Sequence, residues 1–138
     1  MIEDLEREGL ISRLRPDPQR VRDAMKLAHR DLGVATNLLG SSNDWAYTVA
    51  YNAILQAGRA LMFSKGYRPE GGNQHIAIVR FCDLFLSRED ALWFDRMRRK
   101  RHQSVYDTAG SVSDREAENA VKKAEEIVQV MEVLVQES

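Results

Sequence analysis

Apolar residues recur every three or four positions along most of this chain, and no segment alternates apolar and polar residues with a period of two. The last segment shows the pattern most clearly, because it follows Ser113-Asp114-Arg115-Glu116, a sequence typical of a helix capping box. Its apolar residues are Ala117, Ala120, Val121, Ala124, Ile127, Val128, Met131 and Leu134. A helix places them on one face. The chain is therefore expected to be all-α, with helices that bury such faces against each other.

Residues that begin and end helices divide the rest of the chain. Asp17-Pro18 is an N-cap followed by a proline suited to the first helical position, and Gly40 and Gly66 are suited to helix ends. The helices are expected over residues 17–40, 42–65, 73–86 and 87–107, with a short helix over residues 2–14 and loops at 67–72 and 108–112. We predict an antiparallel up-and-down bundle of four main helices with short additional helices.

Length and composition indicate one domain. With 43% hydrophobic residues, 30% charged residues and a net charge of -1, the chain can bury a core without disulfides or metals. The single Cys82 has no partner for an intrachain disulfide, so a reducing compartment is expected. No stretch has the roughly 18 consecutive apolar residues of a membrane span, and the acidic start is unlike a signal peptide. We predict a cytoplasmic protein with no membrane contact.

The apolar stripes also predict the core and an interface. Five residues lie where stripes of different helices should meet and are expected to be largely buried: Met97, Val105, Val121, Ile127 and Val128. Other apolar residues exceed what a single bundle is expected to cover: Trp45, Tyr47 and Tyr51, outside an alanine stripe of their helix, and Leu134 and Val135 near the chain end. We therefore expect a homodimer.

Residues 95–107 form the most unusual segment, because they hold five cationic side chains, a histidine and a tyrosine. On a helix, Arg98, His102 and Tyr106 follow one another four residues apart and form a row. Few acids balance the cations within this helix, so the local field should attract phosphate even though the whole chain is nearly neutral.

Arg101 lies between Phe94, Met97 and Val105 on the apolar stripe of the same helix. A guanidinium in such a position needs a partner, because an unpaired buried charge costs several kcal/mol. That partner is a carboxylate from another helix, a phosphate or a water-filled groove. The alternative for the whole run is a solvated basic face in which Arg101 makes a structural ion pair.

Motifs of the common enzyme classes are absent. The chain has no GxGxxG, no glycine-rich phosphate loop, no GxSxG and no Cys-x-x-Cys. His29, His75 and His102 lie on three different expected helices, and none has a second ligand at the spacing of a metal motif. We expect no cofactor and no metal site, and we expect His29 and His75 to be structural or surface residues.

Several segments share one resemblance. They are Ala46 to Leu61 closed by Lys65-Gly66-Tyr67-Arg68-Pro69, His75 with Val79-Arg80-Phe81, Phe94 to Asp107, and the repeat of Ala117, Ala120 and Ala124. In this order they resemble the helices of the small stand-alone HEPN-domain proteins of bacteria and archaea. The resemblance covers the chain from Asp17 onward and implies a single HEPN-like helical domain over residues 1–138.

The basic run resembles a variant of the superfamily's motif. Active HEPN ribonucleases carry an arginine, then a polar residue that is usually asparagine, and a histidine four to six residues beyond the arginine. Here Arg101 stands for the arginine, His102 for the polar residue, and Tyr106 stands where the histidine is expected. A second alignment pairs Arg96 with His102. The first is preferred, because it keeps Tyr106-Asp107 at the end of the helix, as in the stand-alone proteins.

The resemblance implies two functions of different kinds. The first is binding of RNA or nucleotide phosphate, extended in the family to a metal-independent, toxin-like endoribonuclease; the catalytic residues would be Arg101, His102 and Tyr106, and the phosphate-binding residues Arg96, Arg98 and Arg101. The second is a catalytically inactive dimeric module that partners a minimal nucleotidyltransferase. Tyrosine, with a pKa of about 10, is a poor base compared with histidine, whose pKa is about 6.5. Phosphate binding is therefore favoured and catalysis stays open.

Overall fold

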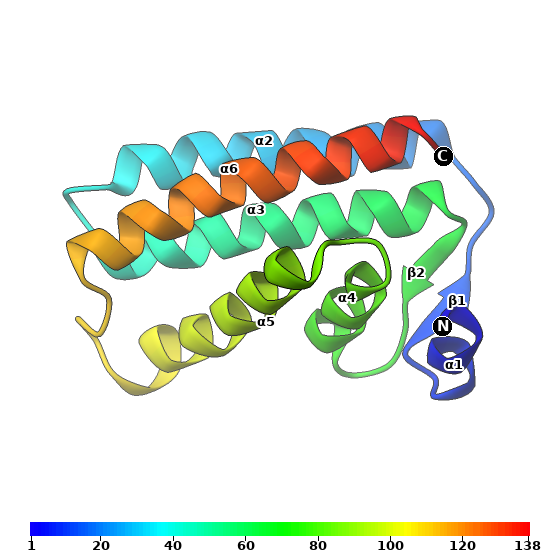
Figure 1. Ribbon diagram of the computed structural model, residues 1–138, viewed down its shortest axis with the longest axis horizontal. Coiled ribbons are helices and arrows are strands. Elements are labelled where there is room, and N and C mark those ends of the chain that lie inside the picture. Colours follow the sequence, from blue (N-terminus) through cyan, green and yellow to red (C-terminus); the bar gives the residue numbers. More distant parts are fainter.

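The computed structural model describes all residues from 1 to 138 and is an up-and-down helical bundle (Figure 1). Its helices are α1 (Ile2–Arg7), α2 (Pro18–Leu38), α3 (Asn43–Ser64), α4 (Gln74–Asp83), α5 (Arg88–His102) and α6 (Asp114–Gln136). The helices α2, α3 and α6 lie side by side, and α5 and α4 cover the other side of α3 (Figure 1). The predicted all-α bundle of four main helices is confirmed. No helix has the length and apolar character that crossing a lipid bilayer requires.

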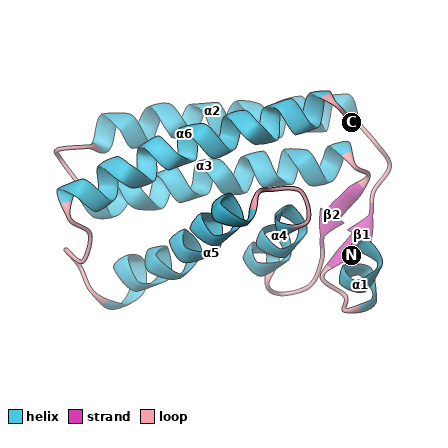
Figure 2. Ribbon diagram, in the orientation of Figure 1, coloured by secondary structure: helices cyan, strands magenta, loops and turns pink.

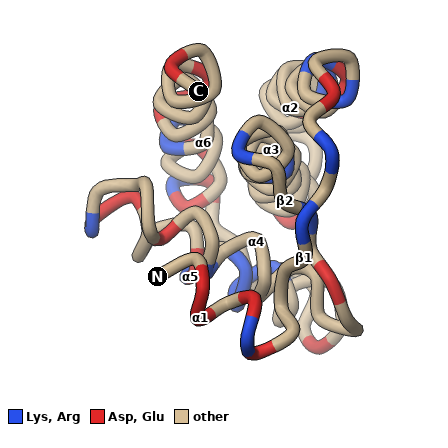
Figure 3. Tube along the Cα trace, turned by 90° about the vertical axis from the view of Figure 1, so that its right-hand side faces the viewer, with Lys and Arg blue, Asp and Glu red and all other residues tan.

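The helix α3 is the centre of the bundle. Its five regularly spaced alanines are all completely buried: Ala46, Ala50, Ala53, Ala57 and Ala60. Small side chains let neighbouring helices approach closely, and α3 packs against α2, α4, α5 and α6. Asp44 and Arg59 are its only charged residues, so its trace is mostly tan where it lies between those of α2 and α6 (Figure 3). Because α3 contacts every other long helix, its position determines where the functional surfaces lie.

The predicted helix starts are confirmed by their capping hydrogen bonds. The Asp17 carboxylate accepts from the backbone N–H of Gln19 at 3.0 Å. Ser113 and Glu116 form the predicted capping box at the start of α6, with two hydrogen bonds of 3.1 Å. These bonds satisfy backbone groups that have no partner within the helix.

Two short strands correct the expectation that the chain contains helices alone. Residues 2–14 form the short α1 and then β1 (Ile11–Arg13), which pairs antiparallel with β2 (Tyr67–Pro69) in the segment expected to be a loop (Figure 2). A strand of three residues is too short to show a period-two pattern. Its hydrogen-bonding partner lies more than fifty residues away in the sequence. The ladder therefore forms only after the chain has folded back on itself.

Four of the five predicted core residues are confirmed, and the fifth is corrected. Met97, Val121, Ile127 and Val128 are 3% exposed or less, whereas Val105 is only half-buried. The reason is a π-helical turn, Gln103–Asp107, that follows α5 and in which the N–H of Thr108 donates to the carbonyl of Gln103. A π-turn rotates each residue by less than an α-helix does, so the α-helical stripe cannot be extended through it.

Gly58 allows the closest helix contact in the bundle. A Cβ atom there would lie 2.7 Å from Cγ2 of Ile78 and 2.9 Å from Sγ of Cys82, and both of these side chains are buried. Overpacking at Gly58 should cost about 1–3 kcal/mol, whereas the higher helix propensity of alanine should stabilise the helix by about 1 kcal/mol. We therefore expect Gly58→Ala to lower the free energy of unfolding by about 1 kcal/mol.

Gly33 on α2 provides the matched control, since nothing lies within 4 Å of a Cβ atom added there. Gly33→Ala should therefore raise the free energy of unfolding by about 0.5–1 kcal/mol. Urea denaturation of both variants measures the difference. Equal stabilisation by the two alanines would contradict the close approach at Gly58.

Candidate functional site

A basic groove of about 660 Å³ lies where the end of α5 faces the start of α4. The residues that line it are Asn73, His75, Arg98, Arg99, Arg101, His102 and Tyr106. The structure thus brings together Arg98, Arg101, His102 and Tyr106, as the row on the predicted helix indicated. It adds His75 and Asn73, which the sequence did not associate with them.

Arg101 is a half-buried cation with no carboxylate partner. Its neighbours are paired: Arg98 and Arg99 reach the Asp95 carboxylate at 2.9 and 3.4 Å, and Lys100 lies 3.7 Å from Glu116. No ion pair within 4.0 Å forms at Arg101, whose guanidinium instead lies 5.5 Å from the centre of the Tyr106 ring. Of the partners considered for Arg101, the structural ion pair is therefore excluded, and the guanidinium is available to a ligand in the groove.

The π-turn places Tyr106 next to His102, the last residue of α5. Tyr106 lies in this turn and is 62% exposed, and its ring centre is 5.0 Å from that of His102. Lys100 holds the following loop by donating to the carbonyl of Ser111 at 3.0 Å. A π-turn next to clustered polar side chains is a frequent feature of functional sites.

His75 enters the groove from α4 and is held from behind by Tyr51. The Tyr51 hydroxyl lies 2.8 Å from Nδ1 of His75, and the two rings are stacked. Burial raises the pKa of Tyr51 well above its ordinary value. Burial, together with the charges of Arg101 and Arg98, lowers the pKa of His75. A neutral imidazole beside two guanidiniums can accept a proton or donate a hydrogen bond at neutral pH.

Arg96 and His29 lie outside the groove. The Arg96 side chain is exposed and its guanidinium lies 5.2 Å from the Trp93 ring, on another side of α5. The structure therefore does not bring Arg96 to the other proposed phosphate ligands. His29 pairs with Glu132 at 2.9 Å on the surface. The alignment that pairs Arg96 with His102 joins residues that do not share one groove.

The comparisons agree with this fold. The sequence model described as the HEPN domain matches residues 21–134. The chain belongs to the HEPN family. A search of curated proteins finds no match in sequence. Among solved structures, the HEPN chain is similar to the crystal structure of TT1696 from Thermus thermophilus, with a TM-score of 0.64 and 22% identity over 83% of this chain and 98% of that chain. This likeness supports the fold of the HEPN bundle.

The sequence alone did not place His75 in the site of this HEPN domain. Its hydrogen bond to Tyr51 spans 24 residues, and its cationic neighbours are about as far away on the other side. The one signal that pointed to it was the resemblance of its helix to the family's third helix. A lone histidine near a helix start has no local pattern that distinguishes a ligand from a surface residue.

The lowered pKa of His75 predicts a pH-dependent stability. The unfolded chain binds a proton at His75 more readily than the folded chain, so this residue's contribution is fully present above about pH 6.5 and is lost as the pH falls from there. His75→Gln removes the titration. We expect thermal melts from pH 8 to pH 5 to show a steeper loss of melting temperature for the wild type than for this variant. Parallel curves would contradict the prediction.

Proposed function

We propose that the basic groove of this HEPN domain binds phosphate groups, most favourably those of RNA and otherwise those of a nucleotide. The observation that carries the proposal is the half-buried Arg101, which lines the groove beside Arg98 and has no acidic partner. An anion in the groove would supply the counter-charge that the protein does not. RNA is favoured because the groove is open and because two aromatic rings, His102 and Tyr106, offer surfaces on which bases stack.

Fluorescence anisotropy with labelled single-stranded RNA tests this proposal. Binding should weaken steeply and log-linearly with added salt, because each phosphate contact releases counterions. A mononucleotide measured in parallel distinguishes the two ligands, since RNA spanning several cations should bind more tightly and with a larger salt dependence. RNA binding that does not respond to salt would contradict the proposed phosphate contacts.

Catalysis extends the same proposal to a metal-independent, toxin-like endoribonuclease. RNA cleavage of this kind requires a base for the 2′-hydroxyl proton, an acid for the leaving oxygen and a cation for the phosphorane charge. Arg101 would stabilise the phosphorane charge, and His102 and Tyr106 would transfer protons as general acid and base. His75 would be a further general base, because its lowered pKa keeps the imidazole neutral. Incubation of end-labelled RNA with the protein in EDTA tests this step. If the RNA stays intact, the protein binds RNA without cleaving it.

The second candidate is a catalytically inactive dimeric module that partners a minimal nucleotidyltransferase. Exposed apolar side chains favour it: Trp45 is 54%, Leu92 51% and Val133 48% exposed. Val133 also borders a surface hollow of about 480 Å³ along α6. Co-purification of the HEPN protein with a nucleotidyltransferase, without RNA binding or cleavage, would select this candidate.

Two of the residues expected at a homodimer interface are instead buried within the chain. Tyr47 and Tyr51 are 4% and 1% exposed, contrary to the expectation of uncovered faces, because neighbouring helices surround α3. Leu134 and Val135 are half-buried and pack against the core, so Trp45 is the one largely exposed residue of the expected interface. The exposed Val133 of α6 adds a second apolar side chain at the surface. HEPN domains are often dimeric, and we infer that this one is as well.

Light scattering at micromolar concentration is expected to give twice the monomer mass of 15.8 kDa. Val133→Lys should shift the population toward monomer, because a charge at an apolar contact is costly to bury. Lys122→Ala, at an exposed site elsewhere on the same helix, is the control and should leave the mass unchanged. A wild-type protein that is monomeric at all tested concentrations would contradict the dimer.

A cytoplasmic location, where RNA is available, belongs to the same proposal. The buried, unpaired Cys82 fits a reducing compartment.

A further inference from the structure

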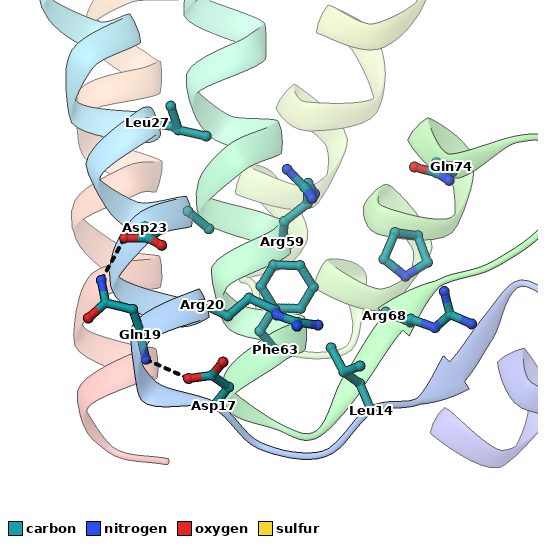
Figure 4. A pocket seen from close by; sticks show the side chains of 12 residues that line it. Leu14, Asp17, Gln19, Arg20, Asp23, Leu27, Arg59, Phe63, Arg68 and Gln74 are labelled. Carbon is teal, nitrogen blue, oxygen red and sulfur yellow. Dashed lines mark hydrogen bonds between the residues drawn. The ribbon is translucent and has the colours of Figure 1, made fainter.

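A second pocket, of about 540 Å³, lies between α2, α3 and β2 (Figure 4). It shares no lining residue with the basic groove, although both border the start of α4, one through Gln74 and the other through His75. Its walls combine apolar side chains with polar ones. No sequence pattern indicated this pocket, because its lining residues come from separate parts of the chain.

Three arginines from three different elements line this pocket. Arg20 belongs to α2, Arg59 to α3 and Arg68 to β2. Figure 4 shows Arg20 and Arg59 beside the Phe63 ring and Arg68 farther away on β2, with its guanidinium directed away from that ring. The guanidinium carbons of Arg20 and Arg59 lie 5.9 and 5.3 Å from the centre of that ring. Contact with a buried aromatic ring limits how far these long side chains can move. The cations are therefore positioned before any ligand arrives.

The arginines have few partners within the protein. Arg59 donates to the Gln56 side chain at 2.9 Å, and Arg68 lies 3.6 Å from Glu70 at the surface. Arg20 makes no side-chain hydrogen bond and no ion pair. Three positive charges around one pocket repel each other unless an anion joins them.

The two acids of the pocket make no ion pair with these arginines. Asp17 caps α2, and Asp23 accepts from the Gln19 side chain at 2.7 Å. Figure 4 shows Gln19 linked to both carboxylates on the α2 wall. Neither acid lies within 4.0 Å of an arginine of the pocket.

We propose that this pocket binds a small ligand through a di- or triphosphate group, held by Arg20, Arg59 and Arg68. Guanidinium groups bind phosphate oxygens in pairs of hydrogen bonds, and three of them suit several phosphate oxygens at once. The volume accommodates a polyphosphate chain and part of an organic group, for which Phe63 and Leu27 provide an apolar wall. The site is separate from the proposed RNA groove and does not depend on it.

Isothermal titration with inorganic tripolyphosphate tests the proposal in an Arg101→Ala background, in which the basic groove is expected to bind anions far more weakly. We expect one binding site per chain to remain. Arg20→Gln and Arg59→Gln should each weaken it about tenfold or more, since each removes charge-assisted hydrogen bonds. Lys26→Ala, an exposed lysine of α2 outside the pocket, is the control and should leave the affinity unchanged.

Arg20 is exposed, so its replacement tests the pocket without disturbing the core. Absence of tripolyphosphate binding, or binding that neither glutamine variant weakens, would overturn the proposal. A parallel titration with adenosine triphosphate distinguishes the source of the phosphate. Tighter binding than that of tripolyphosphate assigns a nucleotide, and equal or weaker binding assigns free polyphosphate.

Discussion

Arg101→Ala is expected to abolish RNA binding by the HEPN groove while the melting temperature changes little. Each lost charge-assisted hydrogen bond is worth about 1.5–3 kcal/mol, so losing the two bonds of a guanidinium–phosphate contact costs about 3–6 kcal/mol, which is a loss of affinity of more than about a hundredfold. Stability should change by only about 0.5 kcal/mol, because Arg101 is not paired with any acid that its removal would leave buried and uncompensated. Anisotropy titrations and thermal melts of the same preparations measure both quantities.

Arg115→Ala is the matched control, since Arg115 is an exposed arginine of α6 that does not line the groove. It removes the same charge and should leave most of the affinity intact. The alternative is a structural arginine, whose removal would cost about 3–5 kcal/mol of stability. An Arg101→Ala protein that melts far below the wild type and still binds RNA would overturn the assignment of this residue as a ligand.

Phe94→Ala is expected to lower the free energy of unfolding by about 3–5 kcal/mol. Phe94 is completely buried, and its ring centre lies 5.8 Å from that of Tyr51, which holds His75 in the groove. Removing the ring leaves a cavity between α5 and α3, where Gly58 also permits close packing. RNA binding should weaken as a secondary effect, because α5 carries Arg98 and Arg101. Urea denaturation gives the first quantity and anisotropy the second.

Leu92→Ala, two residues earlier on α5, is the control for this variant. Leu92 is 51% exposed, so its truncation should change stability by no more than about 0.5 kcal/mol. If Phe94→Ala were equally mild, α5 would not be fixed to α3 by this ring. The groove would then need another explanation for its shape.

Features that depend on near neighbours in the chain could be predicted from the sequence. The caps at Asp17 and Ser113 use residues two or three positions away, and the structure confirms both. The alanine stripe of α3 and the apolar face of α6 repeat at helical spacing and are buried. Arg98 and His102 share a groove because residues four apart share a helix face, and Tyr106 joins them from the π-turn that follows.

Features that depend on distant residues could be decided only by the tertiary structure. The pairing of β1 with β2, the hydrogen bond between Tyr51 and His75 and the contact of Arg20 with Phe63 each join separate elements. The π-turn exposes Val105 more than an α-helical stripe predicts.

Arg101 illustrates both the local and the long-range contributions. Its position on an apolar stripe follows from helical spacing, so the sequence alone established that this cation would be partly buried and would need a counter-charge. Whether a carboxylate from another helix would meet it depended on how α5 packs, and none does. Local periodicity determines which face of a helix is buried, because it is set by backbone geometry. The partner across that face is set by long-range packing, which no local pattern encodes.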